Sequence, residues 1–559
     1  MSKLKGAVSI ILCIVLIVGI AACGGGTTNS PSAPVQPSSA GSPSSPSEPS
    51  AAVSGNKSII IAEQPENGEY DPAGATAYVY FGLQSYCLEG LVDYDPTGTT
   101  IPAAALSWET NEDGTEWTFN LNPDGKWSDG SPVTSADFLN TITRALDPET
   151  GSWYVDSLFM IKGAEEAFFG EGSIDDIGVE LTDDYTIKFY LDSPYANFLD
   201  YVILPVYRPS SVKYATKEDE AWDLDPAKNL GNGPFHLSER VPGQSITFIP
   251  NEYYSKKENV HYDTVIYKFM NDDQSKTSAY STGEIDVFPG APYYVQDQYA
   301  GKPDLDKAEV LVTNYILFNI NQAPFDDVRV RQAFALAVDR QGICDILGNS
   351  KIPSTTFVAS GYKSKVDGRR WADVQDTLLE ENVEAAKALL AEAGYPDGAG
   401  LPPITYTYPS MSYEADVAQA LQAQWKTNLG VDVSLNAMEY EVYVNSRRNG
   451  ELQLSRHQWT GDYNDPATWL DMYRLGNSQN DVEWSNDEYN ALMAQSAGEL
   501  DPQKREDILK AAERILVTDD TVICPLFITE SIYLINPAIS GYKPATMGGF
   551  DFKTGDIDK

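Results

Sequence analysis

The sequence predicts a mixed α/β fold, because strand patterns and amphipathic helix patterns follow one another along the chain. Glu116–Leu121 alternates apolar and polar residues, which is typical of a half-buried strand. Val310–Ile320 is a long apolar run that fits a buried central strand. Glu381–Ala393 has the spacing of an amphipathic helix and is followed by Gly394, a residue type that commonly ends helices.

Other stretches repeat these patterns through the body of the chain. We expect further strands at Ser58–Ala62, Thr186–Leu191, Ile246–Ile249, Thr264–Phe269 and Val431–Leu435. We expect further helices at Thr76–Val92, at Asp326–Arg340, where the two aspartates cap the start, and at Ala415–Leu429. No internal repeat accompanies these elements.

Length and charge narrow the possible functions. The chain has 559 residues, which is too many for one ordinary core and enough for two or three domains. Its formal net charge of −42 argues against nucleic acid or an anionic bilayer as a direct electrostatic partner. The simplest interpretation of this charge is a soluble surface that keeps proteins apart, and we expect a monomer.

Residues 1–22 have the pattern of a lipoprotein signal peptide. Lys3 and Lys5 precede the apolar stretch Ala7–Ile20, which is too short for an ordinary membrane span. Small residues then precede Cys23, which fits cleavage after Ala22 and a lipid on the new N-terminal cysteine. A plain secretory signal with an incidental cysteine is the alternative.

Residues 23–55 continue from that cysteine as a segment rich in Gly, Ser, Pro and Thr and nearly uncharged. Such a composition cannot bury enough apolar surface to fold, so we expect a disordered tether. The lipid would do nearly all the anchoring, each buried methylene contributing about 0.8 kcal/mol. The expected location is the extracytoplasmic face of the bacterial cytoplasmic membrane.

Three cysteines remain in the body, Cys87, Cys344 and Cys524, an odd number without metal-ligand spacing. We therefore expect no disulfide framework and no metal or cofactor, and small buried side chains at these positions. We expect no enzyme either, because the chain lacks a Gly-x-Ser-x-Gly elbow, a His-Glu-x-x-His zinc motif and a phosphate loop. A secreted hydrolase that uses two carboxylates needs no short motif and stays an alternative.

Six segments carry a joint resemblance to a known family. They are Ala105–Phe138, Gly178–Phe198, Asn232–Leu237 (NGPFHL), Ser281–Val287 (STGEIDV), Asn314–Arg340 and Leu429–Leu435 (LGVDVSL). In order and spacing they resemble the solute-binding proteins of peptide ABC importers, a family that includes oligopeptide- and dipeptide-binding proteins. The resemblance covers nearly the whole mature chain.

The resemblance implies a fold of the periplasmic-binding-protein type II-like class, with two lobes, an additional small β-rich domain and a hinged ligand cleft. Domain I would comprise residues 56–89, 212–312 and 526–559. The small β-rich domain II would comprise residues 90–211, and domain III residues 313–525. Two strand crossovers would form the hinge.

The stretch Ser455–Trp469, SRHQWTGDYNDPATW, combines arginine, tryptophan and acidic residues, which suits a ligand with both charges and an apolar body. By the resemblance, Asp462 matches the aspartate that pairs with a ligand's α-amino group. Arg447 and Arg456 match two arginines that approach the ligand's carboxylate, a task that suits the planar guanidinium group. Arg447 also lies in the last turn of an expected helix, so a structural role is its alternative.

Aromatic and acidic residues complete the implied ligand-binding set. Trp459 and Tyr440 match aromatic pocket positions, and ordinary core packing is the alternative for Tyr440. Tyr463 belongs to the stretch that carries the implied aspartate. Tyr154 matches a tyrosine that closes over the ligand backbone, and Glu89 would lie near the N-terminal end of the cleft.

The implied function is that of a substrate-binding lipoprotein. It would capture oligopeptides between the lobes and deliver them to the membrane permease of an ABC importer, so short peptides and the permease are the expected partners. A binder of dipeptides, sugar or nickel on the same scaffold is the first alternative. A peptide-sensing lipoprotein would use the same pocket.

Overall fold

The computed structural model describes residues 57–558, except 65–69, 75–77, 220, 349, 412, 478 and 546–548. At residues 78–82 and 293 it describes the backbone without the side chains. The expected signal peptide, Cys23 and the tether therefore lie outside the described residues. Within the described ranges, no helix combines the length and the apolar character needed to cross a membrane.

A mixed sheet of eleven strands dominates the fold. Ten strands lie in the order β15 (Val433–Met438), β14 (Ile404–Pro409), β16 (Leu454–Thr460), β12 (Leu305–Phe318), β17 (Ile523–Ile535), β11 (Val287–Pro289), β1 (Ser58–Glu63), β10 (Thr264–Phe269), β9 (Ser245–Pro250) and β8 (Phe235–Val241). The eleventh, β13 (Lys351–Pro353), pairs with β17. Parallel pairs such as β1 with β10 and antiparallel pairs such as β12 with β16 occur in the same sheet.

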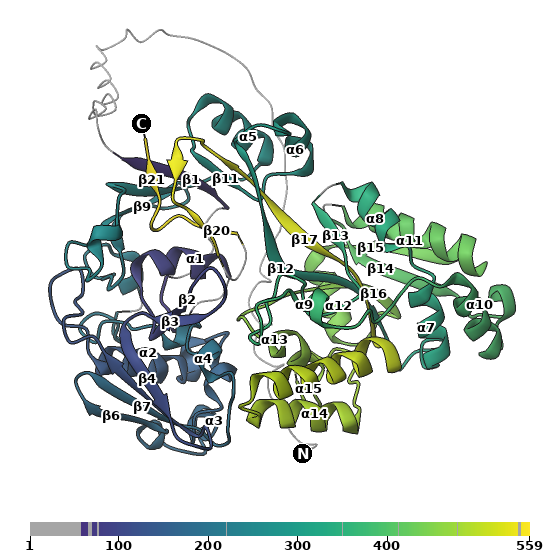
Figure 1. Ribbon diagram of the computed structural model, residues 1–559, viewed down its shortest axis with the longest axis horizontal. Helices are drawn as coiled ribbons and strands as arrows, with labels where there is room; N and C mark the ends of the chain where they lie inside the picture. Colours follow the sequence, from purple (N-terminus) through teal and green to yellow (C-terminus); the bar gives the residue numbers. More distant parts are fainter. Residues whose placement is uncertain are drawn as a thin grey trace, which may run out of the picture. The chain divides into compact units, whose positions relative to one another are not determined.

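The two longest strands, β12 and β17, run antiparallel and side by side in the sheet (Figure 1). The other neighbour of β12 is β16, whereas β17 also pairs with β11. The first part of β12 pairs with Glu530–Leu534, and the second part pairs with Ile523–Ile528 after a register shift between Glu309 and Thr313. Such an irregularity bends a strand and increases its twist. The boundaries predicted at 312/313 and 525/526 fall inside these two strands, and the three-domain division stays a prediction.

A separate four-stranded antiparallel sheet lies in the first part of the chain, in the order β4 (Ala105–Thr110), β5 (Glu116–Leu121), β7 (Thr186–Tyr190) and β6 (Val179–Asp183). On β5, Trp117, Phe119 and Leu121 are buried, whereas Asn120 is exposed, as the alternation predicts. Nearby, β2 (Val92–Tyr94) and β3 (Thr100–Pro102) form a hairpin.

Helices occupy the connections between these strands. The longer ones are α1 (Tyr78–Cys87), α2 (Ser135–Ala145), α5 (Asp273–Thr282), α7 (Val328–Leu336), α8 (Arg340–Leu347), α10 (Val383–Glu392), α11 (Glu414–Leu429), α12 (Tyr440–Arg448), α14 (Asp487–Gly498) and α15 (Pro502–Arg514). The shorter ones are α3 (Ala164–Phe168), α4 (Phe198–Tyr201), α6 (Tyr293–Tyr299), α9 (Trp371–Val374) and α13 (Ala467–Leu470). Near the C-terminus, β18 (Ile539–Ser540) pairs with β21 (Asp556–Ile557), and β19 (Lys543–Pro544) pairs with β20 (Phe550–Asp551).

The prediction of one helix over Asp326–Arg340 is wrong, because this stretch contains α7 and the start of α8. Asp339 has an extended backbone, and its carboxylate accepts a hydrogen bond of 2.8 Å from the Gly342 N–H. A side-chain cap of this kind starts a new helix. The chain therefore turns at Asp339 where the apolar spacing alone predicts continuation.

The hydrophobic core contains the three body cysteines as free thiols, as predicted. Cys344 and Cys524 belong to the large cluster that packs around β12, β16 and β17, and Cys87 belongs to the cluster of the first part of the chain. Burial raises the pKa of the Cys344 thiol to about 12. Such thiols are protonated at neutral pH and chemically inert.

A buried ion pair joins α15 to the segment that follows β16. Arg505 donates to both carboxylate oxygens of Asp465, at 2.5 and 2.8 Å, and Asp465 has no solvent exposure. The Arg505 Nε also donates to the Ser496 carbonyl at 2.9 Å. This planar two-point contact fixes the segment against the helix.

We predict that Arg505→Met lowers the free energy of unfolding by about 3–5 kcal/mol, because it leaves Asp465 buried without its main partner. Arg369→Met is the control, since Arg369 pairs with Asp367 at the surface and should cost less than about 1 kcal/mol. Urea unfolding of both variants measures the difference. Equal losses would contradict the assignment of Arg505 as the residue that holds this segment.

Candidate functional site

Asp462 lies two residues beyond the end of β16, in a turn that fixes its backbone. Its N–H donates to Thr468 Oγ1 at 3.0 Å. The preceding Gly461 has no room for a side chain, because a Cβ there would lie 2.6 Å from the Trp469 ring. Glycine is therefore required where the backbone passes the Trp469 ring, directly before Asp462.

The Asp462 side chain is half-buried, and its carboxylate has little compensation for the water that it has lost. Burial raises its pKa to about 7, the Tyr154 hydroxyl lowers it, and the nearby Asp156 raises it further. The Tyr154 hydroxyl donates to Oδ1 at 3.4 Å, a long hydrogen bond. No lysine or arginine in the described part of the chain contributes to the shift. A cation brought to this place would therefore be bound favourably.

The segment 462–464 meets residues from the first part of the chain. The Tyr463 and Tyr201 rings lie in a tilted contact with centroids 4.7 Å apart, and their hydroxyls share a hydrogen bond of 3.0 Å. The Asn464 N–H donates to the Tyr94 hydroxyl at 3.2 Å. The structure therefore brings together three predicted site residues, Asp462, Tyr463 and Tyr154, from segments about three hundred residues apart.

Lys365 adds a charged contact between the same regions. Its ammonium lies 2.5 Å from Asp200 and 3.6 Å from Asp465. Asp200 is almost fully buried and also accepts a hydrogen bond of 2.6 Å from the Tyr94 hydroxyl. Burial raises the pKa of Asp200, and the Lys365 ammonium opposes that rise. These partners were not anticipated from the sequence, since no local pattern marks them.

Arg456 lies within β16, and its guanidinium is occupied by groups of the chain. It pairs with Glu414 at 2.6 Å and donates to Asn314 Oδ1 at 3.1 Å and to Gln458 Oε1 at 2.5 Å. Its Nε is buried without a hydrogen-bond partner among the described residues. Glu414 opens α11 and is buried, and the sequence does not indicate that it faces an arginine.

Arg447 lies in the last turn of α12, as expected, and forms a buried ion pair with Asp481. Its guanidinium also contacts Nε2 of His457. Burial first, and then Arg447, hold the pKa of His457 well below its usual range, so the imidazole is neutral. Its ring stacks on Tyr315 with centroids 4.8 Å apart. The structure thus places Arg447 in a buried polar cluster.

Three other predicted residues, Tyr440, Trp459 and Glu89, complete the set. Tyr440 begins α12 with 55% of its surface exposed, so it is not packed in the core, and its role at a ligand pocket stays a prediction. Trp459 is half-buried against the large core, with its Nε1 buried and unpartnered among the described residues. Glu89 accepts from the Tyr254 hydroxyl at 2.6 Å and pairs with Lys256 at 3.2 Å.

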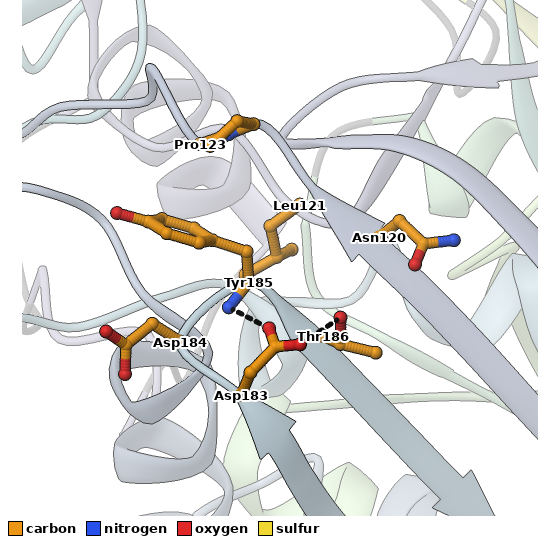
Figure 2. Close-up of a pocket in the computed structure, with 7 residues that line it drawn as sticks. All are labelled: Asn120, Leu121, Pro123, Asp183, Asp184, Tyr185 and Thr186. Atoms are coloured by element: carbon orange, nitrogen blue, oxygen red, sulfur yellow. Dashed lines mark hydrogen bonds between the residues drawn. The ribbon is translucent and has the colours of Figure 1, made fainter.

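A surface hollow near the turn between β6 and β7 is unrelated to these residues. Figure 2 shows its lining, Asn120, Leu121, Pro123, Asp183, Asp184, Tyr185 and Thr186. Asp183 accepts from the Tyr185 N–H at 2.8 Å and from the Thr186 hydroxyl at 3.2 Å. The hollow is therefore the outside of a well-bonded turn, and none of the predicted ligand-binding residues reaches it.

We predict that Asp462→Asn stabilises the ligand-free protein at pH 8 by roughly 2–4 kcal/mol. The pKa of about 7 lies above the ordinary value, so the folded state keeps a proton that the unfolded state releases. Stability from this group is present below about pH 4 and is lost as the pH rises to about 7. The amide has no charge to desolvate, so the advantage should vanish at low pH.

Urea unfolding at pH 4.5 and pH 8 measures this difference. Asp432→Asn at the exposed end of a surface pair removes the same charge from a strongly acidic chain and should show no such pH-dependent gain. A variant less stable than the wild type at pH 8 would show that Asp462 is not held at an energetic cost.

Comparisons with known proteins identify relatives along most of the chain. The family model for bacterial extracellular solute-binding proteins, family 5, matches residues 99–481. Dipeptide-binding protein DppE of Bacillus subtilis is 30% identical over 508 residues, which cover 90% of this chain and 93% of that protein. Oligopeptide-binding protein OppA of the same organism is 31% identical, with 87% and 90% covered.

Solved structures show the same relationship at the level of the fold. The Escherichia coli murein tripeptide-binding protein MppA aligns with a TM-score of 0.73 and 28% identity, covering 91% of this chain and 100% of that one. The peptide-bound OppA of Listeria monocytogenes aligns with a TM-score of 0.72 and 27% identity, covering 90% and 100%. The expected α/β fold class is thereby confirmed. The chain belongs to family 5 of the bacterial extracellular solute-binding proteins.

Proposed function

We propose that this protein captures oligopeptides at a site around Asp462 and delivers them to the permease of an ABC importer. Capture rather than catalysis is the activity of this family, and several relatives are named for the peptides that they bind. The observation that carries the proposal is the half-buried Asp462 carboxylate, which, among the residues that the structure describes, faces the Tyr154 hydroxyl and no lysine or arginine.

A free peptide supplies the missing charge. Its α-ammonium has three donors and would pair with Asp462. Such a pair contributes little net binding energy, because both charges lose water, but removing either partner is costly because the other charge is then left unpaired. Tyr154 and Tyr463 would line the same place, because both already contact Asp462 or its neighbours. The rest of the peptide would be held by backbone hydrogen bonds, which are independent of side-chain identity.

The ligand would connect two regions of the protein. Asp462 follows β16, whereas Tyr154 lies in the segment between β5 and β6. A ligand that contacts both Asp462 and Tyr154 favours the arrangement in which the two residues lie together over one in which they are separated. The size of this preference equals the difference between the ligand's binding free energies for the two arrangements. The contacts of Lys365 with Asp200 and of Asn464 with Tyr94 would then support the ligand-bound form.

We also propose that the protein is held at the outer face of the cytoplasmic membrane by a lipid on Cys23. The pattern of residues 1–22 and the tether composition of residues 23–55 support this location. Extracytoplasmic relatives, such as the periplasmic murein peptide-binding protein MppA of Escherichia coli, are in accord with it. The net charge of −42 means that the protein body would add no attraction to an anionic membrane surface.

We predict that Asp462→Asn and N-acetylation of the ligand both weaken binding, because each change removes one partner of the proposed ion pair between Asp462 and the ligand's α-ammonium. In the wild type, acetylating the N-terminus should cost at least about 100-fold in affinity, since stranding one buried charge costs about 3 kcal/mol and each 1.4 kcal/mol is tenfold. In Asp462→Asn the same acetylation should change affinity by less than about threefold.

The measurement uses a mass-resolved library of tri- to pentapeptides in free and N-acetylated forms, followed by calorimetry on the peptides retained. A double-mutant comparison of this kind isolates the contact between the two groups. Equal sensitivity to acetylation in both proteins would exclude Asp462 as the ammonium partner, and retention of no peptide at all would overturn the proposed ligand class.

We predict that Cys23→Ser abolishes incorporation of an alkyne-labelled fatty acid and releases the protein from the membrane fraction. The reason is that the lipid, which contributes about 0.8 kcal/mol per buried methylene, is the proposed anchor. Cys13→Ser changes the other cysteine of the N-terminal segment and should leave both readouts unchanged. Membrane retention of an unlabelled Cys23→Ser protein would refute anchoring through this residue.

A further inference from the structure

Both arginines that could receive a ligand carboxylate are already paired with carboxylates of the chain. Arg456 contacts Glu414 at 2.6 Å, with side-chain exposures of 13% and 4%. Arg447 pairs with Asp481, with side-chain exposures of 8% and 1%. Each pair is therefore largely removed from solvent. In the low dielectric of the protein interior the attraction between the two charges is strong, and a third charge of either sign also interacts strongly with the pair.

The two pairs lie on opposite faces of β16. Consecutive strand residues point to opposite faces, and Arg456 is followed by His457, the residue that contacts Arg447. Arg456 shares its face with Gln458, to which it donates, and both lie beside Asn314 of β12. A ligand on one face of β16 would therefore meet at most one of the two arginines.

Arg456 contacts three side chains of the protein. A single terminal nitrogen of its guanidinium serves Glu414, Asn314 and Gln458. Glu414 lies at the N-terminus of α11, where the helix dipole favours a negative charge. Burial raises the pKa of Glu414, and the Arg456 and Lys351 charges counter that rise. A ligand carboxylate at Arg456 would have to approach this glutamate against like-charge repulsion.

Lys351 is the remaining cation of this cluster. Its ammonium donates to Thr529 Oγ1 at 3.2 Å and lies 4.5 Å from the centroid of the Tyr413 ring. Burial lowers its pKa to about 8, so it is charged less firmly than an ordinary lysine. Lys351, Arg456 and Glu414 together carry at most one net positive charge. The Tyr413 ring lies against the Lys351 ammonium.

We propose that Glu414 is a specificity-determining residue, which occupies Arg456 in place of a ligand carboxylate, so that the protein binds peptides without reading a free C-terminal carboxylate. The substrate class is then peptides recognised through the N-terminal ammonium and the backbone, whether the C-terminus is charged, neutral or extended beyond the site. Asp481 has the equivalent effect on Arg447. The inference rests on the proposed function.

The test compares free-acid and C-terminally amidated forms of the same tri- to pentapeptides, with binding to the full-length protein measured by calorimetry. The wild type should bind the two forms with affinities within about threefold of each other. Glu414→Gln should prefer the acid by at least about tenfold, because it uncovers the Arg456 guanidinium. Adding Arg456→Gln to that variant should remove the new preference.

Glu309→Gln is the matched control. It removes one anion from an ion pair of 2.9 Å with Arg370, elsewhere on β12, and should leave the acid-to-amide ratio unchanged. A similar gain of acid preference in this control would mean that general charge, and not Glu414, sets the ratio.

The wild-type ratio decides the proposal even if Glu414→Gln fails to fold. A preference for the acid of tenfold or more in the wild type would overturn it, because a cation such as Lys351 would then already read the carboxylate. A folded, peptide-binding Glu414→Gln with an unchanged ratio would overturn it as well. Failure of the wild type to bind either form would instead overturn the proposed function, and this inference with it.

Discussion

The antiparallel pairing of β12 with β17 connects two groups of strands in the large sheet. One group is β15, β14 and β16, and the other is β11, β1, β10, β9 and β8. One part of β12 lies beside β16, and the far end of β17 lies beside β11, so every strand of that sheet is reached through this ladder. The register shift after Glu309 lets β12 bend while the pairing continues on both sides. Because Asp462 follows β16 directly, its position depends on the same pairing.

Electrostatics is the second constraint, since the chain has 81 acidic and only 39 basic residues. Buried carboxylates need cations, and the structure assigns Arg505 to Asp465, Arg447 to Asp481 and Arg456 to Glu414. Asp462 is different, because within the described part of the chain its carboxylate accepts a side-chain hydrogen bond from the Tyr154 hydroxyl alone, at 3.4 Å. A buried group left without compensation is costly, and proteins tolerate such costs mainly at functional sites. The proposed ligand ammonium explains why this cost is retained.

Local patterns predicted the secondary structure well wherever one face of an element is buried. The bounds of β5 and β10 coincide with the predicted strands. Successive side chains of a strand point to opposite faces of the sheet, so buried and exposed residues alternate along it. The helix predicted through Arg340 divides at Asp339, because a carboxylate that caps the Gly342 N–H outweighs the continuing apolar spacing. Spacing records which side is buried, whereas capping depends on the conformation of one side chain.

The sequence by itself determined the fold class and predicted buried cysteines without a disulfide framework. Its resemblance to a family led to the proposal that Asp462 and Tyr154 contact one ligand. Tertiary structure alone decided which charges meet. Glu414 and Arg456 lie 42 positions apart, and Asp481 reaches Arg447 of α12 from the loop before α14, so no local periodicity relates them. The pairing of buried charges follows from three-dimensional proximity in a low dielectric, and an acid-rich sequence offers each arginine many possible partners.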